Sequence, residues 1–399
     1  MNLFTQLAAR LLPWSLGLAI ASVPFYKGLF NVAIVIYALV WLAALPCRNG
    51  FGQRWRNQPA LWWLLALTAW VVLGLFYGEA TGEDLKRPME FVIRMLIVLM
   101  AALAMDVHQR SNLLTAFVIA QSVVLVAVYA LASGVNAYWV DVSLTDHISQ
   151  NLMQSFLVAV ALWRSKSAAT GSARWAWRVL AMLAAYGILM LSDGRTGYLA
   201  LFAVLLVFIV WGRPWWFVPV GIASVVALAV SAYVLNDGFE RATDLISVEA
   251  KMNGEQAEQS SVGARLAMWA FATELIDQKP ILGWGSGGYP GQAKTYFKDQ
   301  ATCSVTCAHT HNQFLFFGVE NGLIGVVLYV GLLITLMRNA RDSKNEEFGG
   351  VVLSYVAVLI VDSLTHGPFW IAREFYFFSS LMPLMLLNAS VETMLEQST

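Results

Sequence analysis

The sequence predicts an all-α, polytopic membrane protein. Hydrophobic residues make up 58% of the 399 residues and charged residues only 13%. Apolar runs long enough to cross a bilayer as helices recur from one end of the chain to the other. The 16 Trp and 13 Tyr residues suit belts of aromatic side chains at the two membrane interfaces. We therefore expect a single integral membrane domain over residues 1–399, without a separate soluble domain.

Twelve apolar segments are predicted to be membrane-spanning helices. The first two are expected to form a hairpin that is broken around Pro24, and the sequence 211–214 predicts a tight turn between the eighth and the ninth. Neither an internal repeat nor a low-complexity segment is visible. In chain order the spans are placed at residues 10–25, 28–46, 59–77, 89–106, 112–133, 149–164, 177–193, 195–211, 215–235, 313–336, 349–365 and 370–390.

The distribution of Lys and Arg orients these spans, because positive charge concentrates in cytoplasmic loops. With a cytoplasmic N-terminus, the short outer loops contain only Lys27, Lys86, Arg87 and Arg195. Both termini are therefore predicted to be cytoplasmic. The long loop 237–311 is predicted to contain helices and to lie outside, which in a Gram-negative cell is the periplasmic face of the inner membrane. The inner loops then hold the larger set, Arg10, Arg48, Arg54, Arg56, Arg110, Arg164, Lys166, Arg174, Arg178, Arg213, Arg338, Arg341 and Lys344.

Net charge and ligand spacing argue against two classes of protein. The formal net charge of +0 disfavours a nucleic-acid partner. A zinc site is not expected, because only His309 and His311 lie near Cys303 and Cys307 and no second ligand pair is present. The two cysteines form a C-x-x-x-C pattern in the outer loop. A disulfide bond and two free thiols are both compatible with that pattern in an oxidising compartment.

The most informative segment begins at His311, where the long polar loop enters an apolar helix. Asn312 follows directly, and the carboxylate of Glu320 comes nine residues after the histidine, inside otherwise apolar sequence. Ionisable groups at membrane depth are energetically costly, so they are interpreted by default as functional. An imidazole at a membrane surface can take a proton from a nucleophile near neutral pH. This pattern indicates chemistry at the membrane interface rather than simple transport.

Two arginines in outer segments predict a phosphate site. Arg195 lies in a short polar turn, where the alternative role is an interfacial anchor, and Arg265 lies in a predicted amphipathic helix, where the alternative is a solvated charge. Guanidinium groups bind phosphates bidentately and stay charged at any relevant pH. Together they can hold a diphosphate and stabilise the negative charge that grows on it as a leaving group. The glycine-rich stretch 283–288 either adds backbone N–H groups to this site or is a flexible turn.

At these positions the chain resembles the superfamily of O-antigen ligases and polymerases. The pattern H-N-x-x-L-x-x-x-x-E-x-G-x-x-G is matched by residues 311–325. It is preceded by G-A-R-L-A-M-W at 263–269 and by K-P-I-L-G-W-G at 279–285, in the order found in the superfamily. The resemblance covers roughly residues 190–370. Within it, residues 261–268 are most similar to the O-antigen ligases of lipopolysaccharide assembly.

The resemblance implies a glycosyltransferase that uses no nucleotide sugar. Its donor would be an O-antigen glycan on undecaprenyl diphosphate, and its acceptor a sugar hydroxyl of lipid A–core. Both substrates would be anchored among the membrane lipids. The essential arginines of the family correspond to Arg195 and Arg265, and its essential histidine, the general base, corresponds to His311. His309 is the lesser candidate, because Asn312 follows His311 as in the family. Transfer would invert the anomeric centre and would need neither a metal nor another cofactor.

Other polar residues inside the predicted spans have a structural and a functional interpretation each. Arg94 is either paired within the bundle or in contact with the donor phosphate, and Asp362 either makes a polar contact at a helix end or orients the catalytic charges. Arg373 and Glu374 are expected to form a local ion pair. Three amides either line a sugar path or form hydrogen bonds between helices; they are Gln150, Asn151 and Gln154. The residues predicted to bind or orient the substrates are therefore Asn312, Glu320, Asp362, Arg94 and His309.

Three alternative functions remain open. An O-antigen polymerase and a protein O-oligosaccharyltransferase share the same motifs and differ from a ligase in the acceptor. A polyprenyl-glycan transporter would suit twelve spans, but no two-half repeat is visible, and a single long outer loop breaks the symmetry between the halves. The sequence therefore favours an enzyme.

Overall fold

The structure is a computed structural model. It describes residues 3–25, 27–45, 55, 58–105, 107–134, 146–192, 194–235, 261–297 and 303–387. Every regular element within these ranges is a helix, and no strand occurs in them. The all-α fold class is therefore confirmed for the part of the chain that the structure describes.

The helices up to residue 235 begin and end close to the predicted spans. The first two form the expected hairpin, with Pro24 in the turn between them. The helices are α1 (Leu3–Ser22), α2 (Lys27–Ala44), α4 (Pro59–Tyr77), α5 (Lys86–Ala104), α6 (Arg110–Ala132), α8 (His147–Ser167), α9 (Gly171–Met190), α10 (Arg195–Val210) and α11 (Phe217–Leu235), with the 3-10 helices η2 (Gly82–Leu85) before α5 and η3 (Val107–Gln109) before α6.

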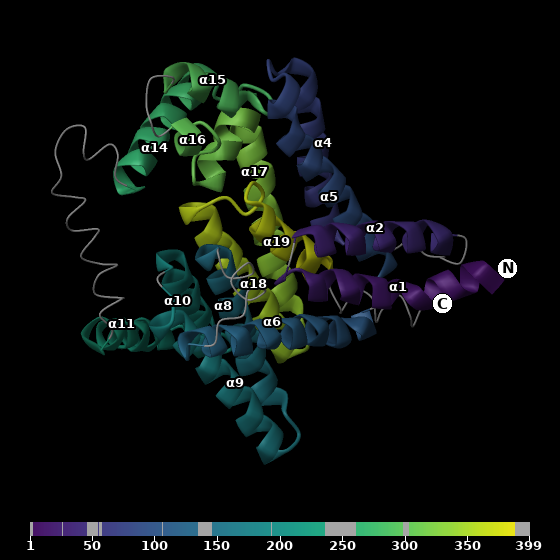
Figure 1. Ribbon diagram of the computed structural model, residues 1–399, viewed down its shortest axis with the longest axis vertical. Coiled ribbons are helices and arrows are strands. Elements are labelled where there is room, and N and C mark those ends of the chain that lie inside the picture. The colour runs from purple at the N-terminus through teal and green to yellow at the C-terminus, as the bar shows by residue number, and fades with distance from the viewer. Residues whose placement is uncertain are drawn as a thin grey trace.

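The remaining helices build the region that contains the histidine motif. They are α14 (Ser261–Gln278), α15 (Gly288–Tyr296), α16 (Cys303–Thr306), α17 (Gln313–Asp342), α18 (Glu346–Thr365) and α19 (Ala372–Leu386). In Figure 1, α14, α15 and α16 lie together at one end of the molecule next to α17, and α9 lies at the opposite end. Helices α14, α15 and α16 therefore cover the end of α17 at which the histidine motif begins.

Within the described residues, each of the twelve predicted spans coincides with a helix, but fewer of these helices are long and apolar enough to cross a membrane. By length and composition, five of the described helices qualify, namely α2, α4, α6, α17 and α18. The apolar helix α10 and the segment Phe217–Ser231 of α11 are shorter. These helices support a membrane protein, and the number of twelve spans stays a prediction.

A kink at Gly322 divides α17. Gly322 has φ 63° and ψ −167°, a conformation that is essentially confined to glycine. A broken helix is tolerated in a bilayer where the freed backbone groups find other partners. Backbone groups beside the kink do so in four hydrogen bonds, which pair Val319 O with Trp284 N, Glu320 O with Gly285 N, Asn321 O with the Trp70 indole and Leu323 N with Pro280 O.

The glycine-rich turn 283–288 is the structural partner of this kink. The N–H groups of Trp284 and Gly285 donate to carbonyls of α17, and that of Ser286 donates to a carbonyl of α4. A Cβ atom at Gly283 would collide with the backbone of α17. Because these N–H groups are already bonded, the interpretation in which they cradle a diphosphate is wrong.

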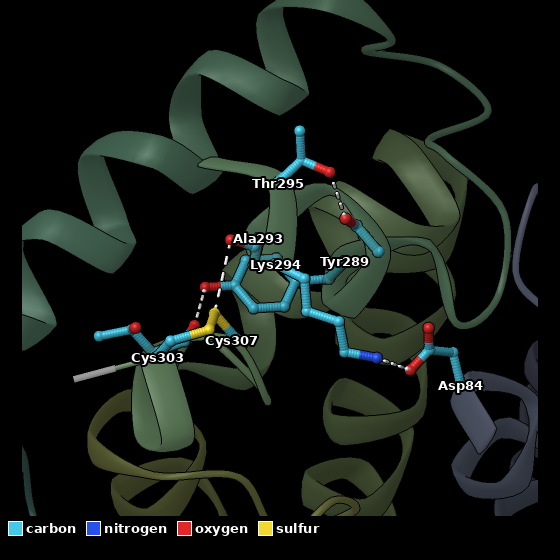
Figure 2. The surroundings of a disulfide bond; sticks show 9 residues. Asp84, Tyr289, Ala293, Lys294, Thr295, Cys303 and Cys307 are labelled. Carbon is cyan, nitrogen blue, oxygen red and sulfur yellow. Dashed lines mark hydrogen bonds and ion pairs between the residues drawn. A yellow bond between two sulfur atoms is a disulfide. The ribbon is translucent and has the colours of Figure 1, made fainter. Parts of the chain in front are cut away.

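A disulfide bond between Cys303 and Cys307 closes α16 and resolves the two alternatives that the sequence left open. Figure 2 shows how its surroundings connect α15 to neighbouring segments. The hydroxyl of Tyr289 donates to the backbone carbonyl of Thr306 at 2.9 Å, and Lys294 pairs with Asp84 of η2 at 2.7 Å. These contacts fix the segment that leads, a few residues later, into the histidine motif.

Replacing Gly322 with Ala is predicted to destabilise the protein. The new Cβ would meet the carbonyl of Ile281, and a non-glycine residue in this backbone conformation costs on the order of 1–3 kcal/mol. The measurement is the midpoint of thermal unfolding in detergent. Gly291→Ala is the matched control, because it lies in α15 and its Cβ would meet no atom within 4 Å. Equal midpoints for the two variants would show that the kink does not depend on glycine.

Candidate functional site

The histidine loop, residues 309–312, connects α16 to α17. Asn312 is the N-cap of α17, and its side-chain oxygen accepts two backbone N–H groups of the first turn at 3.0 and 3.1 Å. The N–H of His311 donates to Nδ1 of His309 at 2.8 Å. Within the described ranges, His311 is the one non-glycine residue with a positive φ, at 48°. Strained backbone of this kind clusters at functional sites.

Helix α14 packs against the histidine loop. The indole of Trp269 donates to the backbone carbonyl of Thr310 at 2.9 Å. Arg265 precedes Trp269 by one helical turn and so lies on the same face of α14. Its positive charge acts on the imidazoles of His309 and His311. The structure therefore brings Arg265 and His311, which are 46 positions apart in the sequence, into one site.

Burial keeps the imidazoles of this loop uncharged. It is the main cause that lowers the pKa of His311 to about 3, and the neighbouring His366 and the charge of Arg265 lower this pKa further. Burial also holds the pKa of His309 well below its usual value, with the adjacent imidazoles as the next cause. At pH 7 His311 is therefore neutral, and one of its ring nitrogens has a lone pair that can accept a proton.

A second imidazole lies beside the first. His366 follows α18, and its ring centre is 5.0 Å from that of His311. Its Nδ1 lies 2.6 Å from Oε1 of Glu374 on α19 and 3.9 Å from Oδ1 of Asp362 on α18. Both carboxyl side chains are fully buried. Asp362 thus lies near His366, and Glu374 is hydrogen-bonded to it. The expected ion pair of Glu374 with Arg373 stays a prediction.

Arg195 is the first residue of α10 and is half-buried. The turn before it is fixed to α8, because the side-chain amide of Asn151 donates to the hydroxyl of Ser192 at 2.8 Å. Helix α8 is in turn bonded to the buried carboxylate, since the Ser149 hydroxyl donates to Oε1 of Glu374 at 3.3 Å. Arg195 therefore begins its helix at the end of α8 that contacts the cluster of His366, Asp362 and Glu374.

Two other predicted site residues lie elsewhere. Glu320 is buried beside the glycine-rich turn, where the N–H groups of Gly287 and Tyr289 bond to its carboxylate. Arg94 lies over the aromatic ring of Tyr376, 4.1 Å from its centre, within α5 and α19. Neither residue is among the groups that contact the three histidines. For Asn312, the structure shows a helix-capping role.

The amides of α8 are mainly structural. Gln150 donates to the backbone carbonyl of Pro24 at 2.9 Å, and Asn151 bonds to Ser192. Gln154 is buried with no hydrogen-bond partner among the described residues and faces a cavity of about 460 Å³ between α6, α8 and α9. Hydrogen bonding between helices therefore accounts for Gln150 and Asn151.

A cleft of about 360 Å³ adjoins the histidine loop. Its wall includes the disulfide and Trp370, whose ring centre lies 5.7 Å from that of His309. The rest of the wall carries both signs of charge, from Lys27, Glu83, Asp84, Lys86, Arg87, Glu90 and Lys294. Such a wall can hydrogen-bond to a ligand that is rich in hydroxyl and phosphate groups.

Asp362, His366 and Glu374 are also residue types that bind divalent ions, and their ligand atoms lie within 4.8 Å of one another. The 2.6 Å separation of His366 from Glu374 is, however, that of a hydrogen bond. The expectation that the site works without a metal stays a prediction.

Sequence reasoning missed the pairing of His366 with Glu374. Both residues are visible in the sequence, and an imidazole four residues after Asp362, at the end of an apolar segment, was a signal of the same kind as His311. What could not be read was the contact itself, because it depends on how α18 and α19 pack.

Comparisons with known proteins match part of this chain. A family model described as O-Antigen ligase matches residues 179–330. A protein of Rickettsia conorii named "Putative polysaccharide ligase" is 29% identical over 99 residues, 24% of each chain. An uncharacterised protein of Haemophilus influenzae is 33% identical over 97 residues. The match to the Haemophilus influenzae protein covers 23% of each chain. The chain therefore spans about a quarter of the length of each of these two relatives. Arg195, Arg265 and His311 all lie inside the region that the family model matches.

Proposed function

We propose that the protein is an O-antigen ligase. It transfers an O-antigen glycan from undecaprenyl diphosphate to a sugar hydroxyl of lipid A–core. The observation that carries this proposal is the neutral, half-buried imidazole of His311 beside Arg265. A base without charge next to a fixed cation suits a reaction in which a hydroxyl loses a proton and a diphosphate leaves.

The arginines supply the electrostatic part of the reaction. Arg195 and Arg265 hold the two phosphates and stabilise the charge that develops as the bond to the anomeric carbon breaks. His311 takes the proton of the acceptor hydroxyl, whose oxygen forms the new bond at the anomeric carbon. Attack opposite to the leaving diphosphate inverts that carbon. The bound diphosphate also makes His311 a stronger base, because a nearby anion favours the protonated ring.

The cleft that includes Trp370 is the proposed site of the lipid A–core acceptor. Its lysines and Arg87 suit the phosphates of such an acceptor, and its carboxylates suit sugar hydroxyls. The region lies at the end of α17 that the positive charges of the sequence orient toward the periplasm of a Gram-negative cell. An O-antigen polymerase or a protein O-oligosaccharyltransferase would use the same base and arginines with a different acceptor.

Replacing His311 with Ala is expected to lower transfer by about 10²–10⁴-fold, the usual contribution of a general base. Transfer is measured as glycan attached to lipid A–core in membranes from a strain without another ligase. His108→Ala, at an exposed position in η3, is the control and should transfer normally. Normal transfer by His311→Ala, together with a loss in His309→Ala, would assign the base to the other imidazole.

The pH dependence of the wild-type enzyme provides a separate test. Burial lowers the pKa of His311 to about 3 in the free protein, and kcat/KM reports the free enzyme. The base is lost only when the ring is protonated, so kcat/KM should stay level from pH 7 down past the ordinary imidazole pKa and fall only in more acidic solution. A fall centred near pH 6.5 would show that the base titrates as an ordinary solvated imidazole and would contradict the lowered pKa of His311.

Replacing either Arg195 or Arg265 with Ala is expected to reduce transfer by about 10²–10³-fold while the protein stays folded and inserted. Lysine should restore little activity, because a point charge lacks the bidentate geometry of a guanidinium. Arg178→Ala, on an exposed part of α9, is the control for loss of a positive charge. If an alanine variant retains full activity, its arginine is an interfacial anchor.

A further inference from the structure

We propose that His366, held by Glu374, is a positioning residue for His311 that finally receives the proton of the acceptor hydroxyl. This inference rests on the ligase reaction and adds a second imidazole and its carboxylate partner to it. In this arrangement His311 transfers the proton to His366, and the carboxylate of Glu374 balances the positive charge of the protonated His366 ring.

The first observation is the geometry between His366 and Glu374. Nδ1 of His366 lies 2.6 Å from Oε1 of Glu374, and both side chains are buried. With Glu374 ionised, its oxygen accepts this bond, so Nδ1 carries the hydrogen and the other ring nitrogen, Nε2, is left with a lone pair. The Ser149 hydroxyl also bonds to the same carboxylate oxygen. The carboxylate thus fixes both the tautomer and the orientation of the ring.

The second observation is the position of His366 next to His311. The two ring centres are 5.0 Å apart and the ring planes differ by 31°. Nδ1 of His311 is buried without a hydrogen-bond partner among the described residues. Catalytic hydrogen bonds are often long before a substrate binds, and a single water can also bridge such a gap. The geometry therefore allows a proton to move from one imidazole to the other.

Burial is the main cause that lowers the pKa of His366 below its usual value, and the charges around the ring act on this pKa in both directions. Asp362 of α18 and Asp146, at the start of α8, both favour the protonated ring, whereas burial and Arg265 of α14 oppose it. The other groups that face the ring are Glu374 of α19 and the imidazoles of His309 and His311. When a diphosphate binds to the arginines, its charge offsets that of Arg265. The balance at His366 then shifts toward the protonated ring.

Asp362 contributes to this balance as the partner of Glu374. Neither of its carboxylate oxygens has a hydrogen-bond donor among the described residues, and an oxygen of its carboxyl lies within 4.8 Å of one of Glu374. Two carboxylates this close repel each other, and a proton on the neighbouring His366 relieves that repulsion.

The step balances as follows in atoms and charge. The O–H bond of the acceptor breaks, and its electron pair forms the new bond to the anomeric carbon. The bond from that carbon to the diphosphate oxygen breaks, and the oxygen keeps its electron pair. His311 takes the proton and transfers it to His366, from which water removes it after the products leave.

The test compares Glu374→Gln with Tyr355→Phe. The control removes another buried contact between α18 and α19, the bond from the Tyr355 hydroxyl to the Phe378 carbonyl at 2.8 Å. We expect Glu374→Gln to lower kcat on the order of 10²-fold with little change in KM, since the charge that stabilises the protonated ring is lost. The acid limb of the kcat profile should move to lower pH, because a ring without its carboxylate binds a proton less well. Glu374→Asp should restore part of kcat.

A second variant, His366→Gln, keeps a hydrogen-bonding group beside Glu374 but cannot accept a proton. It should lose activity to a similar degree with a normal unfolding midpoint. The inference is overturned if the folded Glu374→Gln or His366→Gln protein has normal kcat, or if Glu374→Gln loses kcat with an unmoved acid limb. Inactivation of the wild type by EDTA, with recovery on adding a divalent ion, would also overturn it and assign the cluster to a metal. If the wild type and Tyr355→Phe both fail to ligate, the proposed function fails instead.

Discussion

The site depends on the burial of His309 and the partial burial of His311. The rings of His309 and His311 lie between α14, the start of α17 and the segment after α18, where a charged imidazole is poorly solvated. They therefore remain neutral beside Arg265. The same low polarity strengthens the attraction between the arginines and an anionic leaving group. The low polarity of the site thus keeps the base neutral and also strengthens the electrostatic stabilisation of the leaving group.

Helices α14, α15 and α16 hold the histidine loop in place. The Trp269 indole and the Asn312 cap fix its two ends, and the glycine-rich turn fixes α17 at its kink. Since the freed backbone groups at the kink bond to α4 and to the turn, the first turns of α17 are tied to the rest of the molecule. The disulfide of α16 constrains the approach to the loop from the other side.

Much of the fold could be predicted from the sequence, because hydropathy reports directly on long apolar helices. Within the described residues, each of the twelve segments coincides with a helix, and α4 matches its predicted bounds. The number of spans could not be fixed in the same way, since polar residues within α5 and α8 face other helices and still reduce the apparent hydropathy. The role of the glycine-rich turn was also hidden, because its partners lie far along the chain at the kink of α17.

The site was only partly predictable, for a geometric reason. Residues that are close in the sequence can lie far apart in the structure. Glu320 comes nine positions after His311, and along a helix nine positions correspond to about two and a half turns, or roughly 13 Å. Glu320 consequently lies at the glycine-rich turn. Glu374, in contrast, was interpreted through its neighbour Arg373, although its hydrogen bond joins two helices. Local motifs identified His311, Arg195 and Arg265, and only the packing of α18 on α19 identified the second imidazole.

Reconstitution from purified components is the decisive test of the proposed transfer of glycan to lipid A–core. Purified protein in lipid vesicles would be given undecaprenyl diphosphate-linked glycan and lipid A–core, with EDTA and without any nucleotide sugar, and the products would be separated by size. A neutral base and two arginines that replace a metal predict lipid A–core that carries the glycan, together with released undecaprenyl diphosphate. Longer lipid-linked glycan without modified lipid A–core, or no product until a divalent ion is added, would contradict the account.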